Sequence, residues 1–222
     1  MKTEINYPLF ELKQLIVLPG NTVQLQNVSW QMFEAILSQL GESRASRLAY
    51  NNGTLEIKMP LPKHERAKSI IGYLVNVLLE ELVIDCECFA STTFKREDMQ
   101  QGIEPDDCFY IQNEPAVRGK MELDLNIDPP PDLAIEIDNT SDSRLRFNSY
   151  ESLRVLELWR YNGFLLEIYL LQNGEYVKSS ISSNFPNIPI IEIIPHFIEM
   201  SKIAGRSPTI RAFRNWVREQ LQ

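Results

Sequence analysis

The sequence predicts an α/β or α+β domain in which helices flank a mixed β-sheet. Helical and strand patterns alternate along the chain, residues 133–137 form the nearly continuous apolar run of a central strand, and Asn-Gly pairs join consecutive strands near the C-terminus. The 222 residues are 44% hydrophobic and 23% charged, as in a typical globular protein. This composition excludes a disordered chain, a collagen-like fibre and a coiled coil. We expect one domain over residues 1–222.

The first half of the chain predicts two helices and a β-hairpin after a mixed N-terminal extension over 1–28. Ser29 is a suitable N-cap for a helix that ends at Gly41. Asn51-Asn52-Gly53 predicts a tight turn between two strands. A long apolar stripe at helical spacing predicts the clearest helix of the chain. The predicted elements are a helix over 30–40, strands over 47–50 and 54–58, a helix over 63–83 and a strand over 84–91.

The second half predicts the central strand, an antiparallel meander and closing helices. Polar loops are expected over 95–104 and 113–131, on either side of an apolar patch over 108–111. Asn162-Gly163 and Asn173-Gly174 supply the two turns of the meander. The predicted elements are a strand over 133–137, a short helix ending near 153, strands over 155–160, 164–171 and 175–179, and, within 193–222, helices over 194–203 and 209–221.

Charge and cysteine content narrow the class of protein. The formal net charge is -8, so the chain lacks a generic phosphate-binding surface and would meet nucleic acid through a local basic patch or metal ions. Three cysteines predict buried thiols in a reducing compartment rather than disulfides or a zinc site. No stretch approaches the roughly 20 apolar residues of a membrane span, and the N-terminus lacks a signal-peptide core. We expect a cytoplasmic protein with no membrane partner.

Acidic residues beside the central strand predict a metal site. Glu136 is the one charged residue of the apolar run, and a buried carboxylate requires a partner, a metal or a cleft. Asp138 faces the same side of the strand, and Asp106 begins another apolar strand. Such hard oxygen ligands suit Mg²⁺ or Mn²⁺, which would activate a water at a phosphate. The alternative is that Asp106 is a turn residue and Glu136 pairs with an arginine. Asp132 is a rival for the motif aspartate, with turn chemistry as its default role.

Two motifs resemble known families. Pro105-Asp106 followed by Glu136-Ile137-Asp138 resembles the PD-(D/E)XK nuclease signature. A wider pattern is more specific: the run from Pro131 to Ile137, then Tyr150, then Val155-Leu156-Glu157-Leu158-Trp159. It resembles the Uma2 (DUF820) family of restriction-endonuclease-like proteins, which is abundant in cyanobacteria.

The resemblance spans residues 25–200 and implies a restriction-endonuclease-like fold, with Asp106 and Glu136 as metal ligands and Asp138 as a third candidate. Asp138 occupies the position of the signature lysine, so that lysine is missing. A lysine on the next helix, four residues before the tyrosine, takes its role in this family, and Arg146 occupies that position. Because arginine stays protonated, the resemblance implies that Arg146 stabilises phosphate charge and does not abstract a proton.

Glu65 and the adjacent His64, at the start of the long helix, complete the catalytic set that the resemblance implies, although helix polarity also explains both. The expectation is an Mg²⁺- or Mn²⁺-dependent endonuclease that hydrolyses DNA phosphodiester bonds and pairs as a homodimer to cut both strands. The alternative is a nuclease fold that no longer cuts and acts as a binding or regulatory protein, which the missing lysine and the acidic balance favour. A third class is a metal-dependent hydrolase of small phosphate esters, which needs no basic DNA-binding face.

Overall fold

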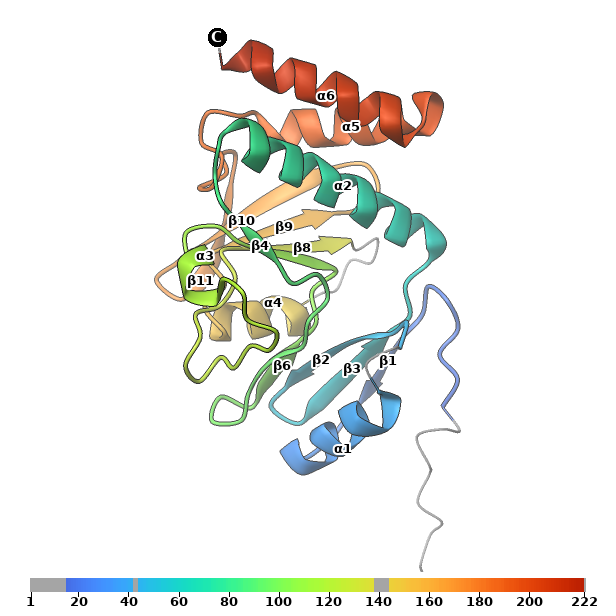
Figure 1. Cartoon of the computed structure of the whole chain (residues 1–222). Helices are drawn as coiled ribbons and strands as arrows, with labels where there is room; N and C mark the ends of the chain where they lie inside the picture. The colour runs from blue at the N-terminus through green and yellow to red at the C-terminus, as the bar shows by residue number, and fades with distance from the viewer. Residues whose placement is uncertain (1–14, 42–43, 138–143, 222) are drawn as a thin grey trace, which may run out of the picture.

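The computed structural model describes residues 15–41, 44–137 and 144–221, whose strands form two β-sheets (Figure 1). The first sheet is antiparallel, with the order β1-β3-β2-β6-β5, and the second is mixed, with the order β11-β10-β9-β8-β7-β4. The strands of the first sheet are β1 (Thr22–Leu25), β2 (Arg47–Asn51), β3 (Thr54–Lys58), β5 (Phe94–Arg96) and β6 (Gln101–Ile103). Those of the second are β4 (Glu87–Cys88), β7 (Asp107–Tyr110), β8 (Leu133–Ile137), β9 (Glu157–Tyr161), β10 (Leu166–Gln172) and β11 (Glu175–Ser179).

Helices cover both sheets. They are α1 (Trp30–Leu40), α2 (Pro62–Glu81), α3 (Glu114–Val117), α4 (Arg144–Ser152), α5 (Ile190–Ala204) and α6 (Arg206–Gln220). In Figure 1, α2, α5 and α6 lie together on one side of the second sheet, and α1 lies against the first sheet. No helix in the described part of the chain is long and apolar enough to cross a membrane.

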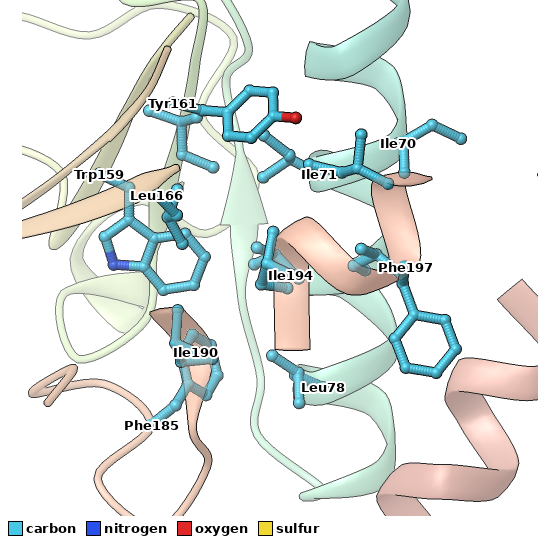
Figure 2. Packing of buried hydrophobic residues seen from close by; sticks show 14 of the residues in the cluster. Ile70, Ile71, Leu78, Trp159, Tyr161, Leu166, Phe185, Ile190, Ile194 and Phe197 are labelled. Carbon is cyan, nitrogen blue, oxygen red and sulfur yellow. The ribbon is translucent and has the colours of Figure 1, made fainter. Parts of the chain in front are cut away.

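Strand β8 is central, as its apolar run predicts. It pairs antiparallel with β7 and parallel with β9, and all five of its residues are buried. One face of β8 packs on α2 and α5 in the largest apolar cluster, part of which Figure 2 shows around Trp159, Ile71 and Ile194. The prediction that the long helix packs on this strand is therefore confirmed.

The opposite face of β8 meets α4 and the first sheet. Ala49 of β2, Ala134 of β8, Leu158 of β9 and Tyr150 of α4 share one apolar cluster. The Ser149 hydroxyl also donates to the carbonyl oxygen of a β2 residue at 3.4 Å. Helix α4 thus joins the two sheets and places the hairpin β2–β3 beside the end of β8.

One meander turn matches the prediction, whereas the other and several short elements differ from it. Asn173 and Gly174 have φ of 53° and 91°, so this pair forms the predicted two-residue turn between β10 and β11. At the other turn Gly163 has a positive φ of 98°, and residues 162–165 form a longer loop between the paired residues Tyr161 and Leu166. The expected strand over 84–91 is only the two-residue β4, and the expected loop over 95–104 contains β6. Strands this short have too few residues to show a period.

Candidate active site

Two buried carboxylates meet at the end of β8. Asp106 directly precedes β7, and its backbone N–H donates to the carbonyl oxygen of Ile135 at 3.1 Å. Asp106 Oδ2 accepts from the backbone N–H of Ile137 at 2.7 Å. These two bonds fix the carboxylate beside Glu136, and the two residues are only 2% and 3% exposed. The convergence predicted from the sequence therefore has a backbone cause, since Asp106 extends the ladder between β7 and β8.

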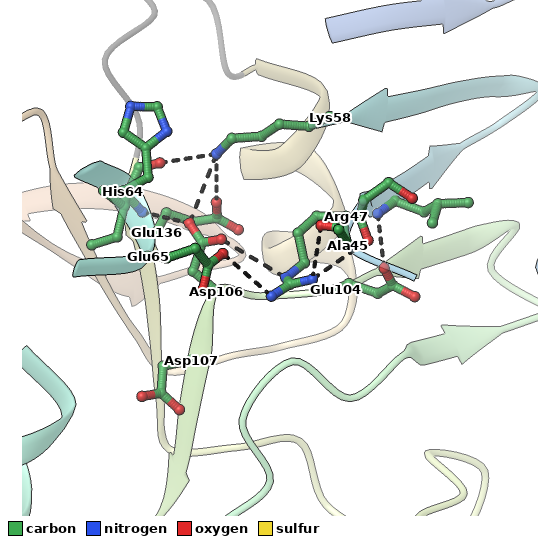
Figure 3. A network of polar contacts seen from close by, with 12 residues as sticks. Ala45, Arg47, Lys58, His64, Glu65, Glu104, Asp106, Asp107 and Glu136 are labelled. Carbon is green, nitrogen blue, oxygen red and sulfur yellow. Dashed lines mark hydrogen bonds and ion pairs between the residues drawn. The ribbon is translucent and has the colours of Figure 1, made fainter. Parts of the chain in front are cut away.

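Lys58, the last residue of β3, reaches both carboxylates (Figure 3). Its Nζ lies 3.7 Å from Asp106 Oδ2 and 3.8 Å from Glu136 Oε2. It also donates to the carbonyl oxygen of Ile137 at 2.9 Å, and the residue is 8% exposed. A cationic group of the protein itself thus contacts both predicted metal ligands.

The two oxygens of the Glu136 carboxylate have different surroundings. Oε1 accepts from Arg146 Nε at 3.0 Å, from Arg146 Nη2 at 2.6 Å and from the Tyr150 hydroxyl. Oε2 is buried and accepts no hydrogen bond from any described residue. Arg146 and Tyr150 therefore hold the carboxylate through one oxygen and leave the other directed toward Lys58.

Arg146 does not occupy the phosphate-facing position that we expected from the sequence. The residue is 2% exposed, and besides Glu136 its guanidinium lies 3.7 Å from Glu56 Oε1 and donates to the carbonyl oxygen of Glu104 at 2.5 Å. Within the described structure, this guanidinium is therefore held by Glu136 and by acceptors of the neighbouring segments. The structure corrects the expectation: Arg146 is a buried counter-ion, as in the alternative in which Glu136 pairs with an arginine.

Burial raises the pKa of Glu136; the Arg146 charge opposes this shift, and the Asp106 charge adds to it. Burial also raises the pKa of Tyr150 well above its usual range. The nearby Glu136 charge raises this pKa further. Tyr150 is therefore a neutral hydrogen-bond donor. The carboxylate at 136 is one whose charge a further cation would stabilise.

The oxygen atoms at this centre fit a small hard cation. Mg²⁺ is usually held by one or two carboxylates and takes its remaining ligands from water and substrate phosphates. Asp106 Oδ2 and Glu136 Oε2, both near Lys58 Nζ, supply such a pair. Within the described residues, no group of three or more His, Cys, Asp or Glu side chains could enclose a metal. The centre thus suits a partly hydrated Mg²⁺ or Mn²⁺ and does not suit a closed structural site.

Arg47 connects the carboxylates to the start of α2. Its Nε lies 4.0 Å from Asp106 Oδ1, and its Nη2 lies 3.6 Å from Glu65 Oε1. The Glu65 side chain is 47% exposed, so it stands at the rim of the centre. His64 Nδ1 accepts from the backbone N–H of Leu61, the N-cap residue of α2, at 3.4 Å. The structure thus gives His64 a local role in starting the helix.

Two further aspartates beside β7 and β8, Asp132 and Asp107, do not join the centre. Asp138 lies outside the described residues. Asp132 accepts backbone hydrogen bonds at 2.7 and 2.9 Å from the segment that follows β7, which is the turn role that we favoured. Asp107 points away from the centre in Figure 3 and accepts from the thiol of Cys88 at 3.3 Å. Burial raises the pKa of Asp107. This neighbour of Asp106 is therefore also a buried acid, but it does not contact Lys58, which lies beside Asp106 and Glu136.

Three charged residues of the hairpin were not predicted from the sequence as part of the site. Arg47, Glu56 and Lys58 lie on one face of β2 and β3, where Arg47 is directly opposite Lys58 in the register. They are 9%, 4% and 8% exposed. In β3 these charged residues alternate with apolar ones, which is the usual pattern of a strand with one solvated face. The one available signal was that three charges share a single face.

The sequence model of Uma2, described as "Putative restriction endonuclease", matches residues 30–201. Among solved structures, the chain is similar to one titled "a putative nuclease belonging to DUF820 from Anabaena variabilis", with 16% sequence identity and a TM-score of 0.48. That match covers 81% of this chain and 96% of the other. No curated protein matches.

Proposed function

We propose that this chain, which belongs to the Uma2 family, is a metal-dependent nuclease that hydrolyses phosphodiester bonds in DNA. The observation that carries the proposal is the asymmetry of Glu136. One carboxylate oxygen is held by three donor groups, and the other is buried without a donor among the described residues. A buried carboxylate oxygen that is held in place but accepts no hydrogen bond is suited to bind a ligand.

Asp106 and Glu136 are the residues that would hold the cation. When bound, Mg²⁺ or Mn²⁺ would lower the pKa of a water and offset the charge that develops on the phosphate. Arg146 and Tyr150 are positioning residues, because they orient Glu136 through the oxygen that does not face Lys58.

Lys58 supplies the positive charge that the family signature places two residues after the glutamate. Its ammonium is a hydrogen-bond donor with three protons, and it is within 4 Å of both carboxylates. In the proposed reaction Lys58 binds a non-bridging phosphate oxygen and orients the phosphate against the attacking water. This role replaces the one that the sequence analysis gave to Arg146.

One observation favours a second candidate function, a nuclease fold that binds without cutting. Positive side chains of the protein already compensate the buried carboxylates. Lys58 pairs with Asp106 and Glu136, and Arg47 pairs with Asp106. Arg146 pairs with Glu136 and Glu56. A cation must therefore compete with three positive side chains, which weakens its binding. Metal affinity discriminates between the two functions, because the binding-only protein needs no cation.

The test is cleavage of supercoiled plasmid with Mg²⁺ or Mn²⁺. Asp106→Asn should abolish cleavage, whereas Asp107→Asn is the matched control, because Asp107 is the next residue and is also buried but faces away from Lys58. Equal cleavage by Asp106→Asn and wild type would refute the proposal. Cleavage that persists in excess EDTA would refute its metal dependence.

Two copies related by a twofold axis would place one centre at each strand of a duplex. We therefore propose a homodimer on DNA as part of this function. Light scattering of the protein with and without a short duplex measures it, and a strictly 1:1 complex that still makes double-strand breaks would contradict it.

A further inference from the structure

A cavity of about 140 Å³ lies at the start of α2. Ile137 forms part of its wall. Because successive residues of a strand point to opposite faces, the cavity is on the other side of β8 from the Glu136 carboxylate. It is nevertheless close to the proposed metal centre, since the carbonyl oxygen of Ile137 accepts the hydrogen bond from Lys58.

The wall of the cavity is apolar. Ala67 of α2, Ile198 of α5 and the ring of Tyr161 join Ile137 in lining it. Figure 2 shows Tyr161 beside Ile70 and Ile71, at the edge of the main apolar cluster. An engineered apolar cavity of about 150 Å³ is known to accept a benzene ring. This cavity therefore has room for about one six-membered aromatic ring.

The rim of the cavity is cationic. Lys63, Arg66 and Lys202 line it, and no Asp or Glu is among the described residues that do so. Arg66 is fixed between two helices, because its Nη2 donates to the carbonyl oxygen of Ser201 at 2.8 Å. The rim also surrounds the first turns of the 20-residue helix α2, whose N-terminal dipole favours an anion. In a chain of net charge -8, these three cations form a local group, in which Lys202 also pairs with Glu199.

We propose that this cavity binds a single pyrimidine nucleotide, with the ring against the apolar wall and the 5′-phosphate against the cationic rim. The pairing of a ring-sized apolar space with a rim of positive charge selects this class over an inorganic anion, which would leave the wall uncovered. The same pairing selects a nucleotide over an uncharged ring, which would make no ion pair with the rim. A purine exceeds the space for one ring and would bind less tightly.

The identification of that nucleotide as part of a DNA substrate rests on the proposed function. Lys58 links the wall residue Ile137 to the two carboxylates. In this proposal, the strand that leaves one base in the cavity continues toward Asp106 and Glu136. Enzymes that act on a base or bind a single strand accept an unstacked nucleotide in this manner.

The experiment is a titration with thymidine 5′-monophosphate in EDTA, followed by NMR or calorimetry. Thymidine 5′-monophosphate should bind at least about tenfold more tightly than thymidine, inorganic phosphate or deoxyadenosine 5′-monophosphate. Ala67→Leu, which fills the wall with a good helix former, should weaken nucleotide binding by at least about tenfold. Lys202→Gln should weaken it by about threefold to tenfold.

Lys178→Gln is the matched control. Lys178 and Lys202 are both exposed, at 61% and 49% of the side chain, and each forms an ion pair with one glutamate. Lys178 does not line the cavity, so its substitution should leave binding unchanged. If Ala67→Leu loses its fold by circular dichroism, Lys63→Gln at an exposed rim position carries the same comparison.

Unchanged nucleotide binding in both Lys202→Gln and Lys63→Gln would overturn the proposal, as would equal binding of inorganic phosphate. Glu136→Gln should bind the nucleotide as wild type does in EDTA. Nucleotide binding without any plasmid cleavage would refute the proposed nuclease and support the cavity. Cleavage without nucleotide binding would refute the cavity and support the nuclease.

Discussion

Glu136 and Glu157 lie at opposite ends of the parallel pair β8–β9, since Glu157 is opposite Leu133 in the register. Both are buried, at 3% and 0% exposure. Glu157 uses both of its oxygens: Oε1 accepts from the Trp159 indole at 2.5 Å, and Oε2 accepts from the backbone and side chains of Ser183 and Asn184. Glu136 uses only Oε1 in this way.

The difference teaches that burial alone does not identify a catalytic acid. Glu157 ties the loop after β11 to the sheet and has no cation among its described partners, so its hydrogen bonds account for it fully. Glu136 keeps one oxygen beside Lys58 and without a donor in the described structure. Counting donors on each oxygen separates an acid that holds the fold from one that is available to a ligand.

The sharpest test of this distinction is the pair Glu136→Gln and Glu157→Gln. Glu136→Gln should lower Mn²⁺-dependent cleavage by at least about 10³-fold, equivalent to about 4 kcal/mol of transition-state stabilisation. Glu157→Gln should keep the activity of its folded fraction within a few-fold of wild type. Initial rates of plasmid nicking, normalised to folded protein, measure both. Equal losses of cleavage activity in the two variants would show that Glu136 and Glu157 do not differ in role.

Arg146→Met should destabilise the protein by about 3 kcal/mol, because it leaves the Glu136 carboxylate buried without its main counter-ion. The free energy of unfolding in urea measures the effect. Lys95→Met is a suitable control, since Lys95 also pairs with a glutamate, Glu34, but the two side chains are 41% and 38% exposed. A loss below about 0.5 kcal/mol in Arg146→Met, similar to that of an exposed pair, would show that Arg146 does not hold Glu136.

Glu157→Gln should lower the free energy of unfolding by about 2 kcal/mol, because an amide nitrogen replaces one of two accepting oxygens and leaves a donor unsatisfied. The loop over 182–185 should then show faster amide hydrogen exchange than the rest of the sheet. A variant as stable as wild type, with unchanged exchange, would mean that Glu157 is not the structural member of the pair.

Lys58→Met should change a free energy by the smallest amount of these variants, and it should strengthen metal binding. Removing the ammonium that competes for Asp106 and Glu136 should tighten Mn²⁺ binding by about tenfold, or about 1.4 kcal/mol. Cleavage should nevertheless fall, because the phosphate loses its donor. Calorimetry with Mn²⁺ measures the first effect and plasmid nicking the second. Weaker metal binding in Lys58→Met would indicate that the lysine organises the carboxylates and does not compete for them.

The sequence predicted the parts of this centre that depend on local patterns. Strand β8 follows from its apolar run, and the convergence of Asp106 with Glu136 follows from adjacent strands. Asn173-Gly174 fixed a turn because its backbone conformation is intrinsic to those residues. The family was recognisable from the motifs alone, and the match over 30–201 confirms it.

The remaining parts depend on contacts between distant segments. Helix α4 is largely polar, which is typical of an exposed helix, yet Arg146 is buried because the hairpin covers it. Strand β6 was missed because its Gly102 has no side chain to add to a pattern. A Cβ at Gly102 would lie 2.7 Å from Phe33 Cζ, so the glycine permits α1 to approach the sheet. Neither fact is visible within a short window of sequence.

The position of Lys58 on the hairpin has a consequence for the order of folding. Lys58 and Ile137 are 79 residues apart in the chain, and they belong to different sheets. Contacts of such long sequence separation form late, because closing a long loop costs entropy before any contact repays it. A chain that has folded only one sheet has the carboxylates without their lysine. The proposed catalytic centre would therefore assemble only when both sheets have folded and docked, and a half-folded copy would lack it.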